Sequence, residues 1–124
     1  MPKLTGYEKA VLEKLLHNAC IARDGGRCVR CGRTEKLCAS HIYPKGTYQR
    51  MRYLLENTLT LCFYCHMRWW HKNPLEASAW AQTVVAPETM ARLKLASQTI
   101  NKKPIDYKLL GVYLKSEIKK YENI

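Results

Sequence analysis

Two pairs of cysteines have the spacing of a metal site. Each is a C-x-x-C motif, Cys28 with Cys31 and Cys62 with Cys65, and all four belong to a chain of 124 residues. Four thiolates from two such knuckles can close a tetrahedron around zinc, which leaves no coordination position for a substrate. We therefore expect a zinc ion that stabilises the fold and takes no part in chemistry. The alternative is that the pairs are buried cysteines without a metal.

Three further side chains that could take part in catalysis or metal binding fall between and just after these pairs. His41 comes just before a Pro-Lys-Gly turn, Asn57 opens an alternating polar and apolar stretch, and His66 directly follows the second pair. Imidazole titrates near neutral pH and can serve as a base or as a neutral metal ligand. A lone histidine is more often a structural hydrogen-bonding residue. His17 has no such neighbours, and we interpret it as structural.

Helical segments are expected on both sides of these residues. Residues 4–23 have a helical apolar period with a capping box at Thr5 and Glu8, and Gly25 and Gly26 end this helix. A short strand is expected at 57–61. Further helices are predicted at 63–71, 87–99 and 104–121. The predicted fold is α+β and mostly helical. We expect one domain over 1–124, with an N-terminal helix at 1–24, a zinc-containing core at 25–72 and a C-terminal helical extension at 75–124.

The order of these residues resembles the HNH endonuclease family, also called ββα-metal or His-Me finger nucleases. The similarity runs from about Cys28 to His71, roughly a third of the chain, and is strongest to lambdoid phage NinG-type recombination nucleases. It implies a small ββα-metal core with a four-cysteine zinc knuckle. It also implies a metal-dependent enzyme that cleaves DNA phosphodiester bonds, with branched recombination intermediates as a substrate class.

The resemblance also assigns roles to individual residues. His41 would be the general base that activates the attacking water. Asn57 would bridge the hairpin loop with side-chain hydrogen bonds and orient His41. His66 would bind a catalytic Mg²⁺ or Mn²⁺ ion.

The chain departs from the family pattern at Ser40, where many members carry an acidic residue or histidine as a second metal ligand. A hydroxyl is a much weaker ligand. Either His66 holds the ion with water and substrate, or another residue substitutes, or the site is impaired. His71 lies five residues after His66, about 140° around an ideal helix, so we expect it not to share the ion unless the helix ends between them.

Basic residues are concentrated in the same part of the chain. The formal net charge is +11, and residues 25–72 hold nine basic and two acidic side chains. Such a surface is typical of phosphate-backbone binding. The candidate DNA contacts are Lys45, Arg50, Arg52 and Arg68, and the alternative is a solvated basic loop.

Two other functions remain open at this level: a catalytically silent, zinc-stabilised DNA-binding module, and a zinc-ribbon protein whose partner is another protein. The sequence contains no apolar run long enough for a membrane span and no signal peptide, so we expect a cytoplasmic protein. The flanking helices either pack around the core or form a homodimer.

Overall fold

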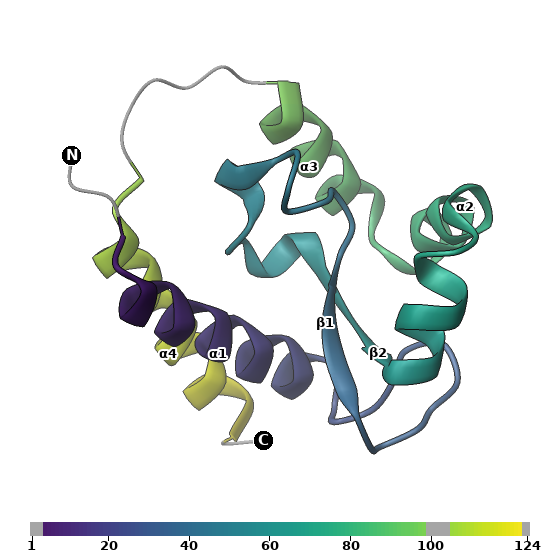
Figure 1. The fold of residues 1–124 in the computed structure, drawn as a ribbon, viewed down its shortest axis with the longest axis horizontal. Coiled ribbons are helices and arrows are strands. Elements are labelled where there is room, and N and C mark those ends of the chain that lie inside the picture. The colour runs from purple at the N-terminus through teal and green to yellow at the C-terminus, as the bar shows by residue number, and fades with distance from the viewer. Residues whose placement is uncertain (1–3, 99–104, 123–124) are drawn as a thin grey trace.

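The computed structural model describes residues 4–98 and 105–122, and within them the chain is mostly helical with one small antiparallel sheet (Figure 1). The α+β class is therefore confirmed. The elements, in chain order, are α1 (Gly6–Arg23), β1 (Leu37–His41), the short 3₁₀ turns η1 (Gln49–Met51) and η2 (Leu55–Asn57), β2 (Thr58–Cys62), the π-helical η3 (Cys65–Trp70), α2 (Pro74–Val84), α3 (Pro87–Gln98) and α4 (Tyr107–Glu122). Residues 99 and 104, the end of one predicted helix and the start of the next, lie outside the described residues.

Helix α1 begins and ends where its local sequence predicts. The Thr5 hydroxyl accepts a hydrogen bond from the backbone N–H of Glu8, and the Glu8 carboxylate accepts one from the N–H of Thr5. Gly25 and Gly26 then follow with φ of 74° and 72°, a backbone conformation that glycine adopts without steric cost. These local signals need no tertiary contact, which is why the sequence predicts them.

The two strands place His41 and Asn57 at one end of the sheet. Strands β1 and β2 pair antiparallel, with Leu37 opposite Cys62 and His41 opposite Thr58. The connecting loop, residues 42–57, therefore starts and ends beside His41. The other end of the sheet leads from Cys62 into η3, so strand, strand and helix follow one another along the chain.

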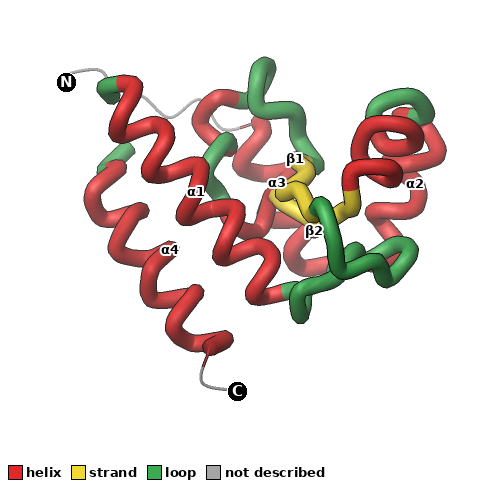
Figure 2. The backbone as a smooth tube through the Cα atoms, turned by 60° about the horizontal axis from the view of Figure 1, so that its bottom comes forward, coloured by secondary structure: helices red, strands yellow, loops and turns green. Residues whose placement is uncertain are grey.

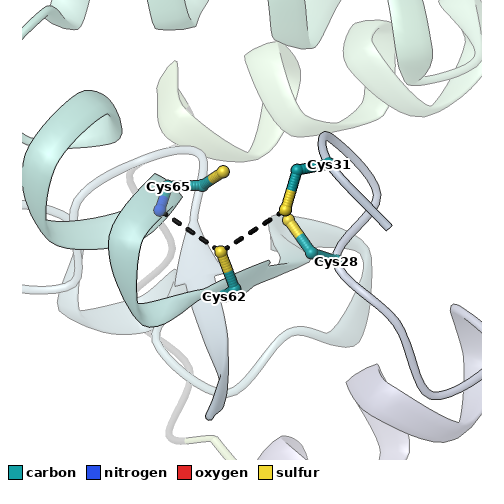
Figure 3. Close-up of side chains that lie close together, drawn as sticks. All are labelled: Cys28, Cys31, Cys62 and Cys65. Atoms are coloured by element: carbon teal, nitrogen blue, oxygen red, sulfur yellow. Dashed lines mark hydrogen bonds between the residues drawn. The ribbon is translucent and has the colours of Figure 1, made fainter. Parts of the chain in front are cut away.

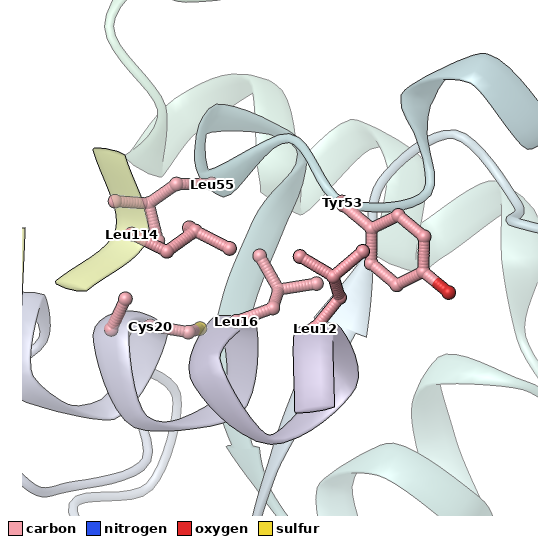
Figure 4. Packing of buried hydrophobic residues seen from close by; sticks show 7 residues of the cluster. Leu12, Leu16, Cys20, Tyr53, Leu55 and Leu114 are labelled. Carbon is pink, nitrogen blue, oxygen red and sulfur yellow. The ribbon is translucent and has the colours of Figure 1, made fainter. Parts of the chain in front are cut away.

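Helix α4 packs along α1, and the main apolar core lies between these helices and the loop that precedes β2 (Figure 4). Both views of the backbone show this helix pair on one side of the sheet and α2 on the other (Figure 2). The buried members of the cluster are Leu12, Leu16, Ala19, Cys20, Tyr53, Leu55 and Leu114. Burial of one such leucine stabilises the fold by about 1.5–3 kcal/mol.

The end of α1 is fastened to β2 by an ion pair that the sequence does not reveal. Arg23 donates hydrogen bonds to the carbonyl oxygens of Leu55 and Thr58, at 2.8 and 2.7 Å, and pairs with Asp24 at 2.8 Å. Asp24 in turn accepts a hydrogen bond from the backbone N–H of Thr60 at 3.0 Å. Side chains thus satisfy backbone groups on the outer edge of β2, which would otherwise be unpaired.

A surface ion pair links α3 to the loop before β2. Arg92 of α3 contacts Glu56 at 2.9 Å, and Leu93 beside it is buried.

No helix in the described ranges 4–98 and 105–122 combines the length and apolar character that a bilayer crossing requires.

Candidate metal centre and histidine cleft

The four cysteines of the two C-x-x-C pairs come together in space (Figure 3). Their sulfur atoms all lie within 4.8 Å of one another, and Sγ of Cys31 lies 3.6 Å from Sγ of Cys62. Thiolates at about 2.3 Å from a tetrahedral ion are separated by about 3.8 Å. The cluster therefore has the dimensions needed to hold a metal ion, as the spacing predicts. None of the six cysteines, all within the described residues, forms a disulfide.

Backbone geometry forms each half of the cluster. The first knuckle turns back through a hydrogen bond from Gly32 N–H to the Cys28 carbonyl at 2.9 Å, with Gly32 at φ 83°. In the second, the N–H of Cys65 points at Sγ of Cys62 at 3.4 Å. Burial opposes ionisation of Cys28, but backbone N–H groups of Cys31 and Cys62 lower the pKa of this thiol to about 7. Such donors favour the thiolate form that binds metal.

Tryptophan side chains pack beside the cluster. Trp70 and Trp80 lie against its buried atoms, and Trp69 meets Trp80 edge to face at 5.2 Å between centroids. Arg30 stacks over the Trp69 ring at 3.8 Å and also donates toward Sγ of Cys65 at 3.4 Å. The three tryptophans thus pack against one another beside the cluster. Of the two single cysteines, Cys20 is fully buried, whereas Cys38 is only half-buried.

His41, the last residue of β1, is held by its ring Nε2. That atom lies 2.7 Å from the backbone carbonyl oxygen of Arg52. Because a carbonyl can only accept, Nε2 carries the proton and Nδ1 has a free lone pair. Burial lowers the pKa of His41, and the nearby positive charges of Lys45 and Arg52 act in the same direction, while the bond to the carbonyl opposes them. The ring is therefore neutral at pH 7.

Asn57 is fully buried at the end of the loop and bonds across it. Its Oδ1 accepts a hydrogen bond from Tyr43 N–H at 2.8 Å, and its Nδ2 donates to the carbonyls of Tyr43 and Met51 at 3.0 and 3.2 Å. The expected bridging of the hairpin loop is confirmed. The same loop carries the Arg52 carbonyl that holds His41.

Ser40 is fully buried, and its hydroxyl lies 2.7 Å from Nδ1 of His66. This bond joins β1 to η3 and leaves Nε2 of His66 as the ring nitrogen available for other partners. Burial lowers the pKa of His66 to about 4, and its electrostatic interactions with the neighbouring His71, His41 and Lys45 side chains act in the same direction. Ser40 is thus a hydrogen-bond partner of the His66 ring.

His71 lies directly against His66, against the expectation for a regular helix. The two Nε2 atoms are 3.0 Å apart and the ring centroids 4.4 Å apart. The reason is the winding of η3, in which the N–H of His71 bonds to the carbonyl of His66, five residues back. A π-helical turn closes between residues i and i+5, so it brings these side chains to one face.

A cleft of about 470 Å³ opens beside these histidines. Residues of β1 and its following turn form one wall, and η3 and α2 form the other, with Met90 of α3 at the edge. Its lining includes His41, Lys45, His66, Trp70, His71, Ser78 and Ala81. The cleft therefore brings together both sequence-predicted histidines and His71, whose ring a regular α-helix would point about 140° away from His66.

The four candidate DNA contacts differ in their surroundings. Lys45 is exposed and lines the cleft, and Arg68 is exposed on η3. Arg50 is exposed on η1. The Arg52 guanidinium pairs with Glu13 of α1, so this side chain already has a carboxylate partner. What sequence reasoning missed at Arg52 is the role of its backbone carbonyl, which side-chain identity does not signal.

No protein-family model, curated protein or solved structure matches this chain.

Proposed function

We propose that this chain is an HNH-type, metal-dependent endonuclease that hydrolyses DNA phosphodiester bonds. The observation that carries the proposal is the arrangement of His41 and His66. Both line one cleft, and each has one ring nitrogen bound by the scaffold, to the Arg52 carbonyl and to Ser40 respectively. Two oriented imidazoles, one suited to accept a proton and one to bind an ion, can together carry out phosphodiester hydrolysis.

His41 acts as the general base in this proposal. Its Nδ1 lone pair accepts a proton from the water that attacks phosphorus. The Arg52 carbonyl, already bonded to Nε2–H at 2.7 Å, stabilises the positive charge that the ring gains. Asn57 is a positioning residue, because its hydrogen bonds fix the loop that carries this carbonyl.

His66 holds the catalytic divalent ion through Nε2. The residues fit this role because Nδ1 is already satisfied by Ser40, which leaves Nε2 in the cleft as the ligand atom. When bound, such an ion polarises the scissile phosphate and stabilises the leaving 3′ oxygen. The products are then 5′-phosphate and 3′-hydroxyl ends.

The four-cysteine cluster holds structural Zn²⁺ in this proposal. Sulfur ligands in a closed set of four favour zinc or an iron–sulfur centre. Because Sγ of Cys31 and Sγ of Cys62 lie only 3.6 Å apart, the cluster fits a single ion. The zinc fixes the start of η3, and so the position of His66, which directly follows Cys65.

The charge of the chain supports DNA as the substrate. The net charge is +11, and Lys45 lies in the cleft wall where it can contact the phosphate beside the scissile bond. Arg50 and Arg68 extend the basic surface of the loop and of η3. We expect DNA binding that weakens steeply as salt increases.

The proposal is tested with supercoiled plasmid, the zinc-loaded protein and added Mg²⁺ or Mn²⁺. Nicking by the wild-type protein and its loss in His41→Ala are expected. His17→Ala is the matched control, because His17 lies on α1 and outside the histidine cleft.

A second candidate is a zinc-stabilised DNA-binding module without catalytic activity. One observation favours it: the described residues that line the cleft include no carboxylate. Carboxylates are the preferred protein ligands of Mg²⁺. Salt-sensitive DNA binding without cleavage under any divalent ion would support this module and contradict the nuclease.

A further inference from the structure

We propose that His66 and His71 together form a two-imidazole site for a transition-metal ion, in place of the carboxylate ligand that the cleft lacks. The inference rests on the proposed function for the role of the ion, and it adds a second ligand and a metal preference. The evidence is the spacing of the two rings, the helix geometry that produces it, and the chemistry of the surrounding side chains.

The separation of the two nitrogens matches a shared ion. Nε2 of His66 and Nε2 of His71 are 3.0 Å apart. Two imidazole nitrogens at about 2.0–2.1 Å from one ion are about 2.8–3.4 Å apart when the angle at the ion lies between octahedral and tetrahedral values. In the absence of an ion, the same distance accommodates a hydrogen bond in which one Nε2–H donates to the other.

The positions of the ring protons allow the hydrogen bond between the two Nε2 atoms to be replaced by a shared ion. In the metal-binding form of the pair, the Nδ1–H of His66 donates to the Ser40 hydroxyl, 2.7 Å away, so that Nε2 of His66 has its lone pair available. His71 then donates from Nε2 in the metal-free state. On metal binding this ring takes the other neutral tautomer, with its proton at Nδ1, and His71 is exposed so that water can mediate the change.

The winding of η3 serves this pairing. In an α-helix, residues five apart point about 140° away from each other. Here the bond from His71 N–H to the His66 carbonyl, 3.2 Å, closes a π turn and brings the two rings together edge to face, at 78° between planes. π turns inside helices occur frequently at functional sites. The energetically unfavourable winding thus coincides with the two candidate ligands.

The donor set selects the class of ion. Imidazole nitrogens suit zinc, nickel, copper and iron, whereas carboxylate and carbonyl oxygens suit magnesium and calcium. Apart from the histidines, Lys45 is the one ionisable side chain among the described residues that line the cleft, and a lysine cation cannot serve as a ligand. We therefore infer that the cleft binds ions such as Ni²⁺ or Co²⁺ much more tightly than Mg²⁺, with water and substrate phosphate as the remaining ligands.

The test is calorimetric titration of Ni²⁺ into protein whose cysteine cluster is already filled with zinc. The wild-type protein should bind Ni²⁺ at a single additional site. His66→Ala and His71→Ala should each weaken it at least about tenfold, while His17→Ala should leave it unchanged. Mg²⁺ should show at least about a hundredfold weaker binding. An unchanged Ni²⁺ affinity in His71→Ala, or tighter binding of Mg²⁺ than of Ni²⁺, would overturn the inference.

Plasmid cleavage by the same variants separates this inference from the nuclease proposal. Histidine-dependent Ni²⁺ binding with no cleavage under any ion would leave the metal site intact and contradict the nuclease. Conversely, Mg²⁺-dependent cleavage that His71→Ala does not slow would support the nuclease and contradict the two-imidazole site.

Discussion

The Ser40 hydroxyl lies 2.7 Å from Nδ1 of His66 and joins the first strand to the helical segment that follows the second. Ser40 occupies the position at which the resembled family often has a metal ligand. In this protein its side chain contacts the ring of a candidate ligand. Its hydroxyl therefore has a physical role as the group that fixes the orientation of the His66 ring.

Replacement of Ser40 tests that role. In Ser40→Ala the Nδ1 atom of His66 loses its hydrogen-bond partner, so the ring is free to rotate or to change tautomer. We expect Ni²⁺ affinity to fall about 10–100-fold, as is usual when a partner of a metal ligand is removed. Titration calorimetry gives the measurement. Ser78→Ala, in the same cleft but on α2, is the control, and equal effects of the two substitutions would rule out the assigned role.

Removal of zinc should destabilise the fold strongly, because the cluster fixes both the 28–31 turn and the start of η3. Elemental analysis should find zinc in the purified protein, and Cys65→Ser should lose it and lower the melting temperature. Trp69 provides the fluorescence signal, since it lies beside Arg30 and the cluster. Cys38→Ser is the matched control, because Cys38 lies outside the cluster. Protein that is purified without metal and unfolds at the same temperature would contradict this account.

The pair of Arg23 and Asp24 predicts a dependence of stability on pH. Burial raises the pKa of Asp24, but hydrogen bonds from Arg23 and from Thr60 outweigh it, so the folded-state pKa lies below its ordinary value. The stabilisation is thus fully present above the unfolded value of about 3.9 and is lost as pH falls through the lower folded value. Acid unfolding of the wild-type protein should show this loss.

Asp24→Asn should lower the free energy of unfolding by about 1–3 kcal/mol at neutral pH and flatten its acid dependence. Urea unfolding between pH 7 and pH 3 measures both. Glu56→Gln breaks the exposed pair with Arg92 and should change stability by less than about 1 kcal/mol. If the unfolding free energy of Asp24→Asn changed with pH as steeply as that of the wild type, Asp24 would not be the titrating group.

The packing of α4 against α1 can be tested at two leucines of the same helix. Leu114 is fully buried in the main core, whereas Leu109 is 64% exposed. Leu114→Ala should cost about 2–5 kcal/mol of unfolding free energy through lost burial and the cavity left behind. Leu109→Ala should change it by no more than about 0.5 kcal/mol. Equal costs in urea unfolding would mean that α4 does not pack as described.

The features that could be predicted from the sequence are those with local causes. The capping box at Thr5 and Glu8, the glycine stop after α1 and the two cysteine knuckles each depend on residues a few positions apart. His41 and His66 could be selected as candidate site residues because of their places between and just after the two cysteine pairs.

The remaining features depend on contacts between distant segments. The bond from Arg23 to the Thr58 carbonyl spans 35 positions, and the bond from Ser40 to His66 spans 26. The π winding of η3 has no signature in the periodicity of its residues, so the meeting of His66 with His71 could not be foreseen. The carbonyl of Arg52, which holds His41, belongs to the backbone and has no residue-type signal at all.

The central claim is that His41 and the His66 pair face one site, and paramagnetic broadening of histidine ring signals by Mn²⁺ tests it most directly. In zinc-loaded protein, a small addition of Mn²⁺ should broaden the ring signals of His41, His66 and His71 together, and more strongly than those of His17, which lies outside the cleft in the neighbouring pocket behind His41. Broadening of His66 and His71 with an unaffected His41 ring, or no selective broadening of any of the three, would contradict the account.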